Sequence, residues 1–278
     1  MAETCKAGMP HEFGGGCSIE VEGGVAGERL AMLSSEEIER YDRQIRVWGV
    51  RAQEKLKAAK VVIVGAGGLG SPVAYYLAAA GVGAIAIVDS ENVELSNLNR
   101  QILHWTIDVG KPKVVSAKEK LERLNPHVRV QAVNRKIGKV EDAVEIIRDA
   151  DVVIDCLDNW ATRFALNEAC VRLRKPLVHA GVRALYGQVT VIKPFEGPCL
   201  RCIFPRNPPE EASFPIAGPL PGILGALESL EALKIISGYG ETLTGKLLFY
   251  DGYRNTFDIV KVERRPDCPV CGSKPQNA

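Results

Sequence analysis

Residues 61–70 read VVIVGAGGLG, a run of four β-branched residues that leads directly into a loop with four glycines. An alanine-rich helical stretch follows at once. A buried strand, a glycine turn and a helix start are therefore predicted in that order. In such a turn, backbone N–H groups of the loop can face phosphate oxygens, with the helix N-terminus behind them. This stretch predicts a nucleotide-binding α/β fold.

Strand-like runs and helical stretches then alternate to about residue 180. This alternation is typical of a Rossmann-like, mostly parallel sheet with helices on both faces. After Gly187 the rhythm changes, and antiparallel strands are expected to extend the sheet around an irregular Pro-rich stretch at 194–221. The expected strands span 61–64, 85–88, 128–133, 152–155, 177–180, 188–193, 246–251 and 256–262, and the expected helices span 34–46, 51–57, 71–80, 112–124, 140–149, 160–173 and 222–237.

The chain divides at Ser34. Residues 1–33 are rich in glycine and lack periodicity, so they are expected to form a tail without regular structure. Ser34, followed closely by Glu36 and Glu37, has the chemistry of a helix N-cap. Residues 34–278 are expected to form one domain, with N-terminal helices at 34–60, a nucleotide-binding half at 61–183 and a partner-binding, metal-bearing half at 184–278.

Composition argues against several functions. The chain has 35 Lys and Arg residues against 34 Asp and Glu, a net charge of +1. No global field therefore favours nucleic acid or an anionic membrane, and any anionic ligand must be held locally. The N-terminus has no charged segment followed by a long apolar run. Neither a secretory signal nor a membrane anchor is predicted, and a cytoplasmic location is expected.

A candidate triphosphate site follows the glycine loop. Asp89 ends the apolar run 85–88, where a carboxylate can accept hydrogen bonds from a ribose. Asn97, Arg100 and Lys113 come next, and such groups can stabilise the charge that builds up on phosphates as a bond breaks. Two alternatives stay open. The loop and Asp89 equally suit a nicotinamide or flavin dinucleotide, and any single basic residue could belong to a solvated surface.

Asp158 lies in the sequence DCLDN, residues 155–159, directly after the apolar run 152–154. It is expected just past a strand end, at the same edge of the sheet as the glycine loop. A carboxylate there could hold the magnesium ion that accompanies ATP, because Mg²⁺ prefers one or two carboxylates plus phosphate oxygens. The alternative is that Asp158 or Asn159 caps the following helix.

Four of the eight cysteines are paired by spacing, in CLRC at 199–202 and in CPVC at 268–271. Each two-residue gap lets neighbouring sulfurs point at one ion, and two such pairs predict a closed, structural zinc site. Redox-active pairs are the alternative. The expected zinc ligands are Cys199, Cys202, Cys268 and Cys271.

Together these motifs resemble the ubiquitin-activating superfamily. The chain is most similar to its MoeB/ThiF branch, the adenylyltransferases that activate sulfur-carrier proteins for molybdopterin or thiamine synthesis. The motifs are the glycine loop, Asp89, SNLNRQ at 96–101, GKPK at 110–113, DCLDN at 155–159 and the two cysteine pairs. By this resemblance the ATP-binding residues are Gly65, Gly67, Gly68, Gly70, Asp89 (ribose), Asn97, Arg100, Gln101, Lys113 (triphosphate) and Asp158 (magnesium and the reacting phosphate).

The resemblance also implies a reaction and its partners. The C-terminal glycine carboxylate of a ubiquitin-like carrier ending in Gly-Gly would attack the α-phosphate of ATP, giving an acyl-adenylate and pyrophosphate. No general base is needed, because that carboxylate is already ionised at neutral pH. Arg43 matches an arginine that family members insert into the partner subunit's active site, which implies a homodimer with Arg43 acting in trans. Without the resemblance, Arg43 would be interpreted as a solvated helix residue. The catalytic residues so implied are Arg43, Arg100, Lys113 and Asp158.

One position departs from the family pattern. Many relatives carry a cysteine a few residues before an Ala-Gly pair, in the loop after the first cysteine pair. Counted back from Ala217-Gly218, that position is Phe214, and no cysteine lies between Cys202 and Cys268. The chain is therefore expected to stop at the adenylate. Sulfur delivery or conjugation would fall to another protein, a sulfurtransferase or a transfer enzyme.

Other functions remain open at this point. An NAD-dependent oxidoreductase would share the loop and Asp89 but would leave Arg100 and Asp158 unexplained. A non-catalytic carrier-binding subunit would fit Phe214 but not the full set of phosphate contacts. An activating enzyme for a ubiquitin-like protein conjugated through a transfer enzyme also fits, as does a dehydratase acting on a modified tRNA adenosine, which the near-neutral charge disfavours. The sequence does not decide between molybdopterin synthesis, thiamine synthesis, tRNA thiolation and protein conjugation.

Overall fold

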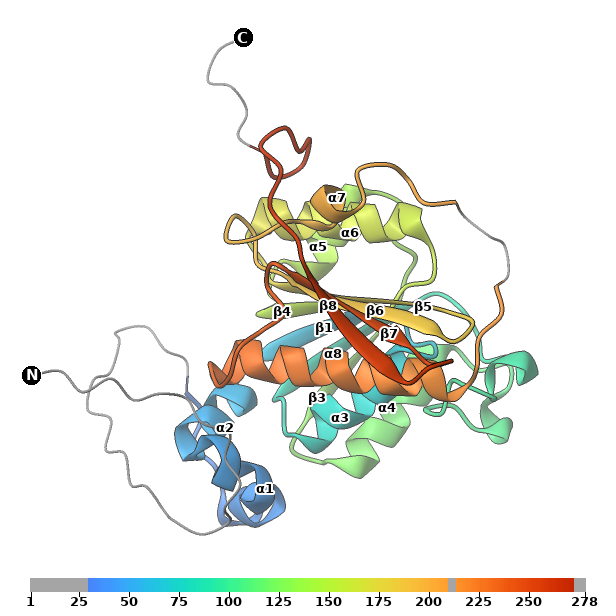
Figure 1. The fold of residues 1–278 in the computed structure, drawn as a ribbon. Helices are drawn as coiled ribbons and strands as arrows, with labels where there is room; N and C mark the ends of the chain where they lie inside the picture. The colour runs from blue at the N-terminus through green and yellow to red at the C-terminus, as the bar shows by residue number, and fades with distance from the viewer. Residues whose placement is uncertain (1–29, 210–213, 273–278) are drawn as a thin grey trace, which may run out of the picture.

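The structure is a computed structural model that describes residues 30–209 and 214–272. A single eight-stranded sheet with the order β3-β2-β1-β4-β5-β6-β7-β8 runs through the molecule (Figure 1). The first five strands in this order are parallel, and β6, β7 and β8 are antiparallel. The predicted Rossmann-like sheet with an antiparallel extension is confirmed. The strands are β1 (Lys60–Val64), β2 (Ala84–Asp89), β3 (Arg129–Asn134), β4 (Val152–Asp155), β5 (Leu177–Arg183), β6 (Tyr186–Ile192), β7 (Lys246–Asp251) and β8 (Thr256–Lys261).

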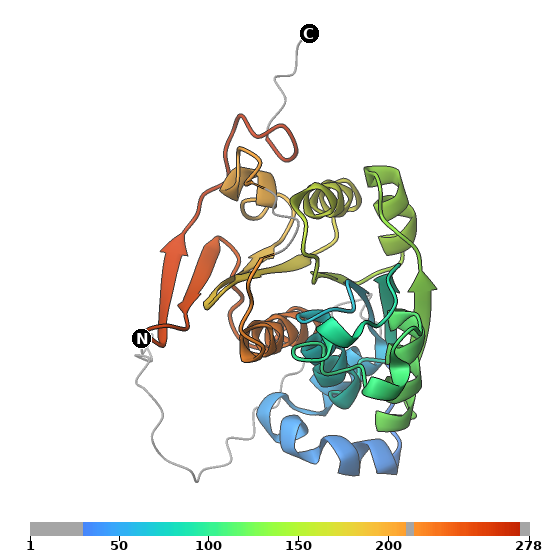
Figure 2. The same ribbon diagram turned by 90° about the vertical axis from the view of Figure 1, so that its right-hand side faces the viewer.

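Helices cover both faces of the sheet, as Figures 1 and 2 show. On one face pack α3 (Gly70–Ala79), α4 (Lys113–Leu124) and α8 (Pro219–Ser237), with α1 (Ser35–Trp48) and α2 (Val50–Ala58) beside them. On the other face pack α5 (Val140–Ile147), α6 (Trp160–Leu173) and the short α7 (Leu200–Ile203). Two 3₁₀ turns, η1 (Leu95–Asn97) and η2 (Thr106–Asp108), lie between β2 and α4.

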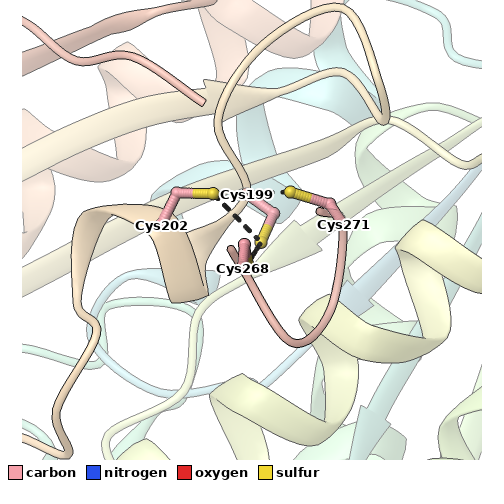
Figure 3. Close-up of side chains that lie close together, drawn as sticks. All are labelled: Cys199, Cys202, Cys268 and Cys271. Carbon is pink, nitrogen blue, oxygen red and sulfur yellow. Dashed lines mark hydrogen bonds between the residues drawn. The ribbon is translucent and has the colours of Figure 1, made fainter. Parts of the chain in front are cut away.

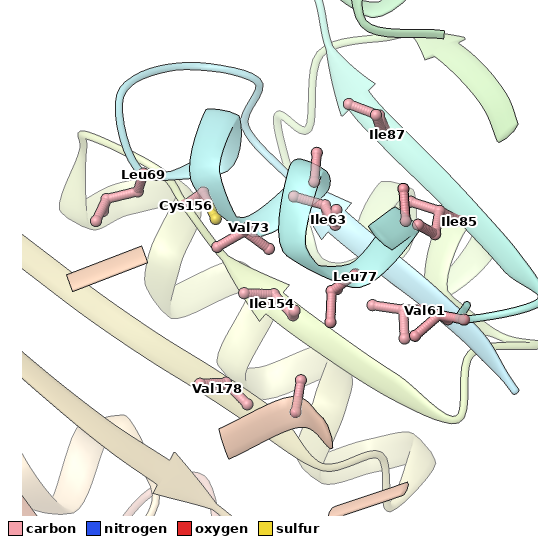
Figure 4. Close-up of a cluster of buried hydrophobic side chains, with 14 of the residues drawn as sticks. Val61, Ile63, Leu69, Val73, Leu77, Ile85, Ile87, Ile154, Cys156 and Val178 are labelled. Atoms are coloured by element: carbon pink, nitrogen blue, oxygen red, sulfur yellow. The ribbon is translucent and has the colours of Figure 1, made fainter. Parts of the chain in front are cut away.

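The central strand β1 is buried on both faces. Val61 and Ile63 belong to the apolar cluster beneath α3 and α8, whereas Val62 and Val64 belong to the cluster beneath α5 and α6. Figure 4 shows Val61 and Ile63 packed with Leu77 of α3. Full burial of each such side chain contributes about 1.5–3 kcal/mol. A strand anchored on both faces provides a fixed base for the glycine loop that follows it.

Two boundaries near the antiparallel strands differ from the sequence prediction. The strand expected at 177–180 continues to Arg183, and the next strand begins at Tyr186 rather than at residue 188. Between them, Ala184 adopts a positive φ of 55° and allows a tight turn. The sequence did not reveal this turn, because the turn residue is an alanine and not a glycine or a proline.

The prediction of an irregular stretch at 194–221 was wrong in part. It contains α7, and it overlaps the start of α8, which begins at Pro219 rather than at residue 222. Proline is tolerated in the first turn of a helix because no backbone N–H donor is needed there. Within residues 30–209 and 214–272, no helix combines the length and apolar character needed to cross a bilayer.

The first helix has the predicted N-cap, whereas residues 1–29 of the predicted tail lie outside the described residues. Ser34 Oγ accepts the N–H of Glu37 at 3.2 Å, and the Glu37 carboxylate accepts the N–H of Ser34 at 2.8 Å. Glu37 also pairs with Lys57 of α2 at 2.6 Å. The capping box thus joins the two N-terminal helices.

Replacing Ser34 tests this cap. We expect Ser34→Ala to lower the free energy of unfolding by about 1 kcal/mol, because the Glu37 N–H loses its acceptor. The matched control is Ser35→Ala, which removes a neighbouring exposed hydroxyl and is expected to change stability by less than about 0.5 kcal/mol. Urea unfolding of the three proteins provides the measurement. Equal stability of Ser34→Ala and wild type would show that the cap contributes nothing.

Candidate active site and metal centre

A cavity of about 400 Å³ opens at the carboxyl ends of β1, β2 and β4. It lies where the strand order reverses, with β2 and β3 on one side of β1 and β4 and β5 on the other. Open α/β sheets bind their ligands at such a switch point. Nine residues predicted from the sequence line this cavity: Gly65, Gly67, Gly68, Asp89, Asn97, Arg100, Gln101, Lys113 and Asp158.

Two predicted site residues do not line it. Gly70 is buried at the start of α3, where a Cβ would lie 2.0 Å from the Gly65 carbonyl oxygen, so its place is one of close packing. Arg43 is exposed on α1. Its neighbour Gln44 donates to the carbonyl of Ala80 at 2.7 Å, at the far end of α3 from the glycine loop. Since the ten residues of α3 span about 15 Å, Arg43 lies well away from the cavity of its own chain.

The glycine loop is held from two sides through Ala66. Its N–H donates to Asp89 Oδ2 at 2.8 Å, and its carbonyl lies 2.8 Å from His104 Nε2. A carbonyl can only accept, so Nε2 carries the proton and Nδ1 accepts from the Ser116 hydroxyl at 2.8 Å. Burial lowers the pKa of His104, which favours this neutral form. His104 is therefore a core residue that supports the loop.

Asp89 has capacity left for a ligand. Its Oδ1 accepts the N–H of Glu91 at 2.8 Å, and its Oδ2 accepts the N–H of Ala66. Each carboxylate oxygen can accept a further hydrogen bond, and the side chain is only half-buried. Two adjacent hydroxyl groups, such as those of a ribose, fit this arrangement.

The cavity is locally basic on a nearly neutral chain. Lys113, whose side chain is 4% exposed, pairs at 2.6 Å with Glu91, whose side chain is 67% exposed. A phosphate in the cavity can replace this solvated carboxylate, because the buried ammonium gains a stronger partner. Of the residues that the structure describes, five basic side chains line the cavity against three acidic ones: Arg100, Lys113, Arg135, Lys136 and Arg163 against Asp89, Glu91 and Asp158.

Two buried polar atoms at the cavity have no hydrogen-bond partner among the described residues, Gln101 Oε1 and Arg163 Nε. Leaving such an atom unsatisfied costs about 1–3 kcal/mol. Both residues line the cavity, so a polar ligand can satisfy them. The Gln101 amide lies against Gly67, where a Cβ would be 3.6 Å from Nε2.

Arg163 was missed in the sequence. It lies in the first turns of α6, donates to the Leu157 carbonyl, and lies 3.9 Å from Asp155 Oδ1. Arg135 and Lys136, directly after β3, were also missed. The sequence does contain one signal for Arg163, because this arginine follows shortly after Asp155, a carboxylate at a strand end.

Asp158 is free to serve the cavity. It is exposed, and its Oδ1 accepts only a long 3.3 Å bond from Asn159 Nδ2 among the contacts described. The helix cap belongs to Asn159, whose side chain accepts the Thr162 N–H at 2.9 Å. The capping alternative for Asp158 is therefore excluded. A carboxylate that faces a basic cavity is suited to hold a magnesium ion that is bound together with a nucleotide.

The four paired cysteines converge on one point (Figure 3). Their sulfurs all lie within 4.8 Å of one another, and three of the separations are 3.4, 3.6 and 4.0 Å. Tetrahedral Zn–S bonds of about 2.3 Å place sulfurs about 3.8 Å apart, so the cluster fits a metal ion. Convergence of both pairs favours a metal centre over two redox pairs. The four residues, all buried, are Cys199, Cys202, Cys268 and Cys271.

The cysteine cluster also contacts the helix that follows Asp158. Leu200, between the first two cysteines, donates its N–H to Asn167 of α6 at 2.8 Å. Burial raises the pKa of the Cys199 thiol and raises that of Cys202 to about 11. Metal ions bind the thiolate form, so metal binding at this cluster would release protons.

Metal analysis tests this centre. We expect about one zinc ion per chain, and we expect chelation under reducing conditions to lower the free energy of unfolding, because structural zinc binding contributes about 10 kcal/mol in model peptides. Cys268→Ser should lose the metal. Cys170→Ala, which removes a buried thiol outside the cluster, should retain it. A fully stable, reduced wild-type protein without bound metal would contradict the assignment.

The ThiF family model matches residues 41–270. The chain is 45% identical over 254 residues to the sulfur carrier protein adenylyltransferase of Thermus thermophilus, covering 87% of this chain and 93% of that protein. It is 46% identical over 253 residues to the adenylyltransferase and sulfurtransferase MOCS3 of Mus musculus, covering 88% of this chain but only 55% of that protein.

Solved structures with a similar fold include E. coli MccB with ATP. Its TM-score is 0.76 at 28% identity, covering 84% of this chain and 75% of that chain. The structure of E. coli MccB with AMPCPP and MccA also matches. Its TM-score is 0.76 at 27% identity, and the match covers 89% of this chain and 77% of that chain. Both comparisons extend over the glycine-loop half and the cysteine-bearing half.

Proposed function

The chain belongs to the ThiF family, and from this premise we propose that it is an adenylyltransferase that activates the C-terminal carboxylate of a ubiquitin-like sulfur carrier ending in Gly-Gly. The observation that carries the proposal is the convergence of nine predicted residues on one basic cavity at the switch point. The names of the Thermus and mouse relatives support the reaction class.

The reaction needs alignment and charge neutralisation. A carboxylate oxygen of the carrier attacks the α-phosphorus, the bond to the β-phosphate oxygen breaks, and pyrophosphate leaves with the electron pair. The carboxylate is already ionised, so the absence of a catalytic histidine from the cavity lining is no obstacle. Lys113 exchanges Glu91 for a phosphate, and Arg100 neutralises charge on the departing pyrophosphate. Magnesium, held by Asp158, would supply further charge neutralisation.

A nicotinamide-dependent oxidoreductase fits this cavity less well. Such an enzyme must hold a pyrophosphate but does not break it, so it has no need of the free Asp158 carboxylate beside five basic side chains. The alternative of a non-catalytic subunit leaves the same groups without a role.

Exchange of labelled pyrophosphate into ATP tests the reaction. With a small Gly-Gly carrier from the same organism, wild type should catalyse exchange, and Asp158→Asn should lower the rate by about 100-fold or more, because charge developing on the phosphates is no longer compensated. The matched control is Asp149→Asn, an exposed carboxylate outside the cavity that should leave exchange unchanged. Wild type that exchanges with no such carrier would rule out the proposal.

Arg43 would act on the partner subunit's cavity within a homodimer. It is exposed and remote from the cavity of its own chain. Exposed apolar side chains lie on both regions that such a dimer would bring together. They are Ile38, Val47 and Val50 on the N-terminal helices, and Leu95, Ile102, Trp105, Ile107 and Val109 in the segment that begins beside the cavity.

Mixing two inactive variants tests action in trans. Arg43→Ala and Asp158→Ala should each be inactive as homodimers. After subunit exchange, each mixed dimer holds one intact site, so an equimolar mixture should recover about one quarter of wild-type exchange activity. Arg46→Ala removes a neighbouring exposed arginine of α1 and serves as the control, with activity near wild type. If the mixture stays inactive although mixed dimers form, Arg43 does not act in trans.

The proposed product is the free acyl-adenylate. Phe214 lines the cavity, and it occupies the position at which the family resemblance implies a cysteine. No cysteine lies between Cys202 and Cys268 in the whole chain. Transfer of the acyl group to sulfur would then depend on a nucleophile from another protein, such as a sulfurtransferase or a transfer enzyme.

A further inference from the structure

One side of the cavity is apolar. Val182 at the end of β5, Phe214 and Ile216 before α8, and Pro221 in the first turn of α8 line it together. This apolar wall reaches the glycine loop, because a Cβ on Gly68 would lie 3.2 Å from the Pro221 ring. Among the described residues, these four side chains carry no charge, whereas the charged side chains of the lining come from other segments.

The segment that contains Phe214 is fixed by the residues that follow it. Ala184, in the turn between β5 and β6, donates its N–H to the Pro215 carbonyl at 2.6 Å and accepts the Ala217 N–H at 3.1 Å. Gly218 packs so closely against Asn99 that a Cβ would lie 2.4 Å from the Asn99 carbonyl oxygen. Phe214 is thus adjacent to a segment held both to the sheet and to the loop that carries Arg100.

The cavity offers no described thiol that could capture the acyl group. Cys156 is the cysteine in its lining, but this residue is only 7% exposed, and its Sγ lies 3.8 Å from the Glu228 carboxyl. Burial, followed by the charges of Glu228 and Asp155, raises the pKa of this thiol well above its usual range. Cys156 is therefore protonated and inaccessible, and the acyl-adenylate must wait for an external nucleophile.

Water is the competitor during that wait. A water oxygen can attack the acyl carbon, and the bond from that carbon to the phosphate oxygen then breaks. AMP leaves with the electron pair as its dianion, both protons of the attacking water pass to solvent, and the carrier returns to its carboxylate form with one ATP consumed. An enzyme that holds a reactive anhydride limits this loss by excluding water from the acyl carbon.

We propose that Phe214 is the residue that shields the acyl-adenylate from water. The inference rests on the proposed function and extends it. Phe214 is the largest apolar side chain of the apolar wall, it is half-buried, and it lines the same cavity as Asp158. A bulky hydrocarbon ring at this place excludes water without offering a group that could take the acyl chain itself.

Two assays on the same full-length variants separate formation of the adenylate from its loss. Pyrophosphate exchange reports formation, and AMP release with ATP and carrier but no acceptor reports hydrolysis. In Phe214→Ala we expect AMP release to rise by about tenfold while exchange stays within about threefold of wild type. Phe214→Leu should restore low AMP release, because it keeps apolar bulk. Phe249→Ala removes a partly exposed phenylalanine of β7 outside the cavity and should match wild type in both assays.

Three outcomes would overturn the inference. An unchanged ratio of AMP release to exchange in Phe214→Ala would show that the ring does not exclude water. Parallel loss of both activities would assign Phe214 to binding or folding instead. Absence of exchange in wild type would overturn the proposed function itself, and is distinguishable because it precedes any effect of a variant.

Discussion

The site depends on how closely the glycine loop approaches the end of β4. A Cβ on Gly65 would lie 2.5 Å from the Cys156 carbonyl oxygen, and Gly65 has a φ of 102°, so only glycine fits there. This contact places the glycine loop, which would face phosphate in the proposed reaction, beside the turn that carries Asp158. Asp89 then accepts the Ala66 N–H and His104 donates to the Ala66 carbonyl, so both backbone polar groups of Ala66 are held. In the proposed reaction, the loop backbone that would bind phosphate and the Asp158 carboxylate are thus held in place before a nucleotide binds, and such preorganisation is the main source of electrostatic catalysis.

The rest of the molecule supports this alignment through α6. The helix begins at the Asn159 cap, directly after Asp158, and Arg163 in its first turns ties the Leu157 carbonyl to the buried Asp155. Asp155 in turn bonds His179 of β5 at 2.7 Å. Arg163 also lies over the ring of Trp160, and Trp160 packs against Phe204 at 4.8 Å between ring centroids. Phe204 follows the first cysteine pair closely in sequence. The cysteine cluster therefore supports the helix on which the position of Asp158 depends, through the bond from Leu200 to Asn167 of α6, although the cluster lies outside the cavity.

Sequence reasoning succeeded where the signal is local. Residue types at short spacing predict the buried strand, the glycine loop and the position of Asp89 at a strand end. The spacing within the two cysteine pairs predicts that they share one site. It failed where the outcome depends on packing between distant segments. Gly70 looked like a phosphate-binding glycine, but the Gly65 carbonyl occupies the space a side chain would need. Arg163 was not singled out in the sequence, and the fold shows that α6 brings it to the cavity. The turn at Ala184 likewise depends on tertiary contacts, because the backbone of Ala184 pairs with Pro215 and Ala217.

The central claim is that this cavity transfers AMP from ATP to the terminal carboxylate of a carrier. Intact-mass spectrometry of the carrier, after rapid acid quenching of a mixture with wild-type protein, ATP and magnesium, tests it most directly. We expect a carrier species heavier by one AMP moiety. This species should be absent when the carrier lacks its last glycine, and absent when a methylene group replaces the α–β bridging oxygen of ATP. A carrier that stays unmodified, in a mixture where ATP and carrier are both shown to bind, would contradict the account.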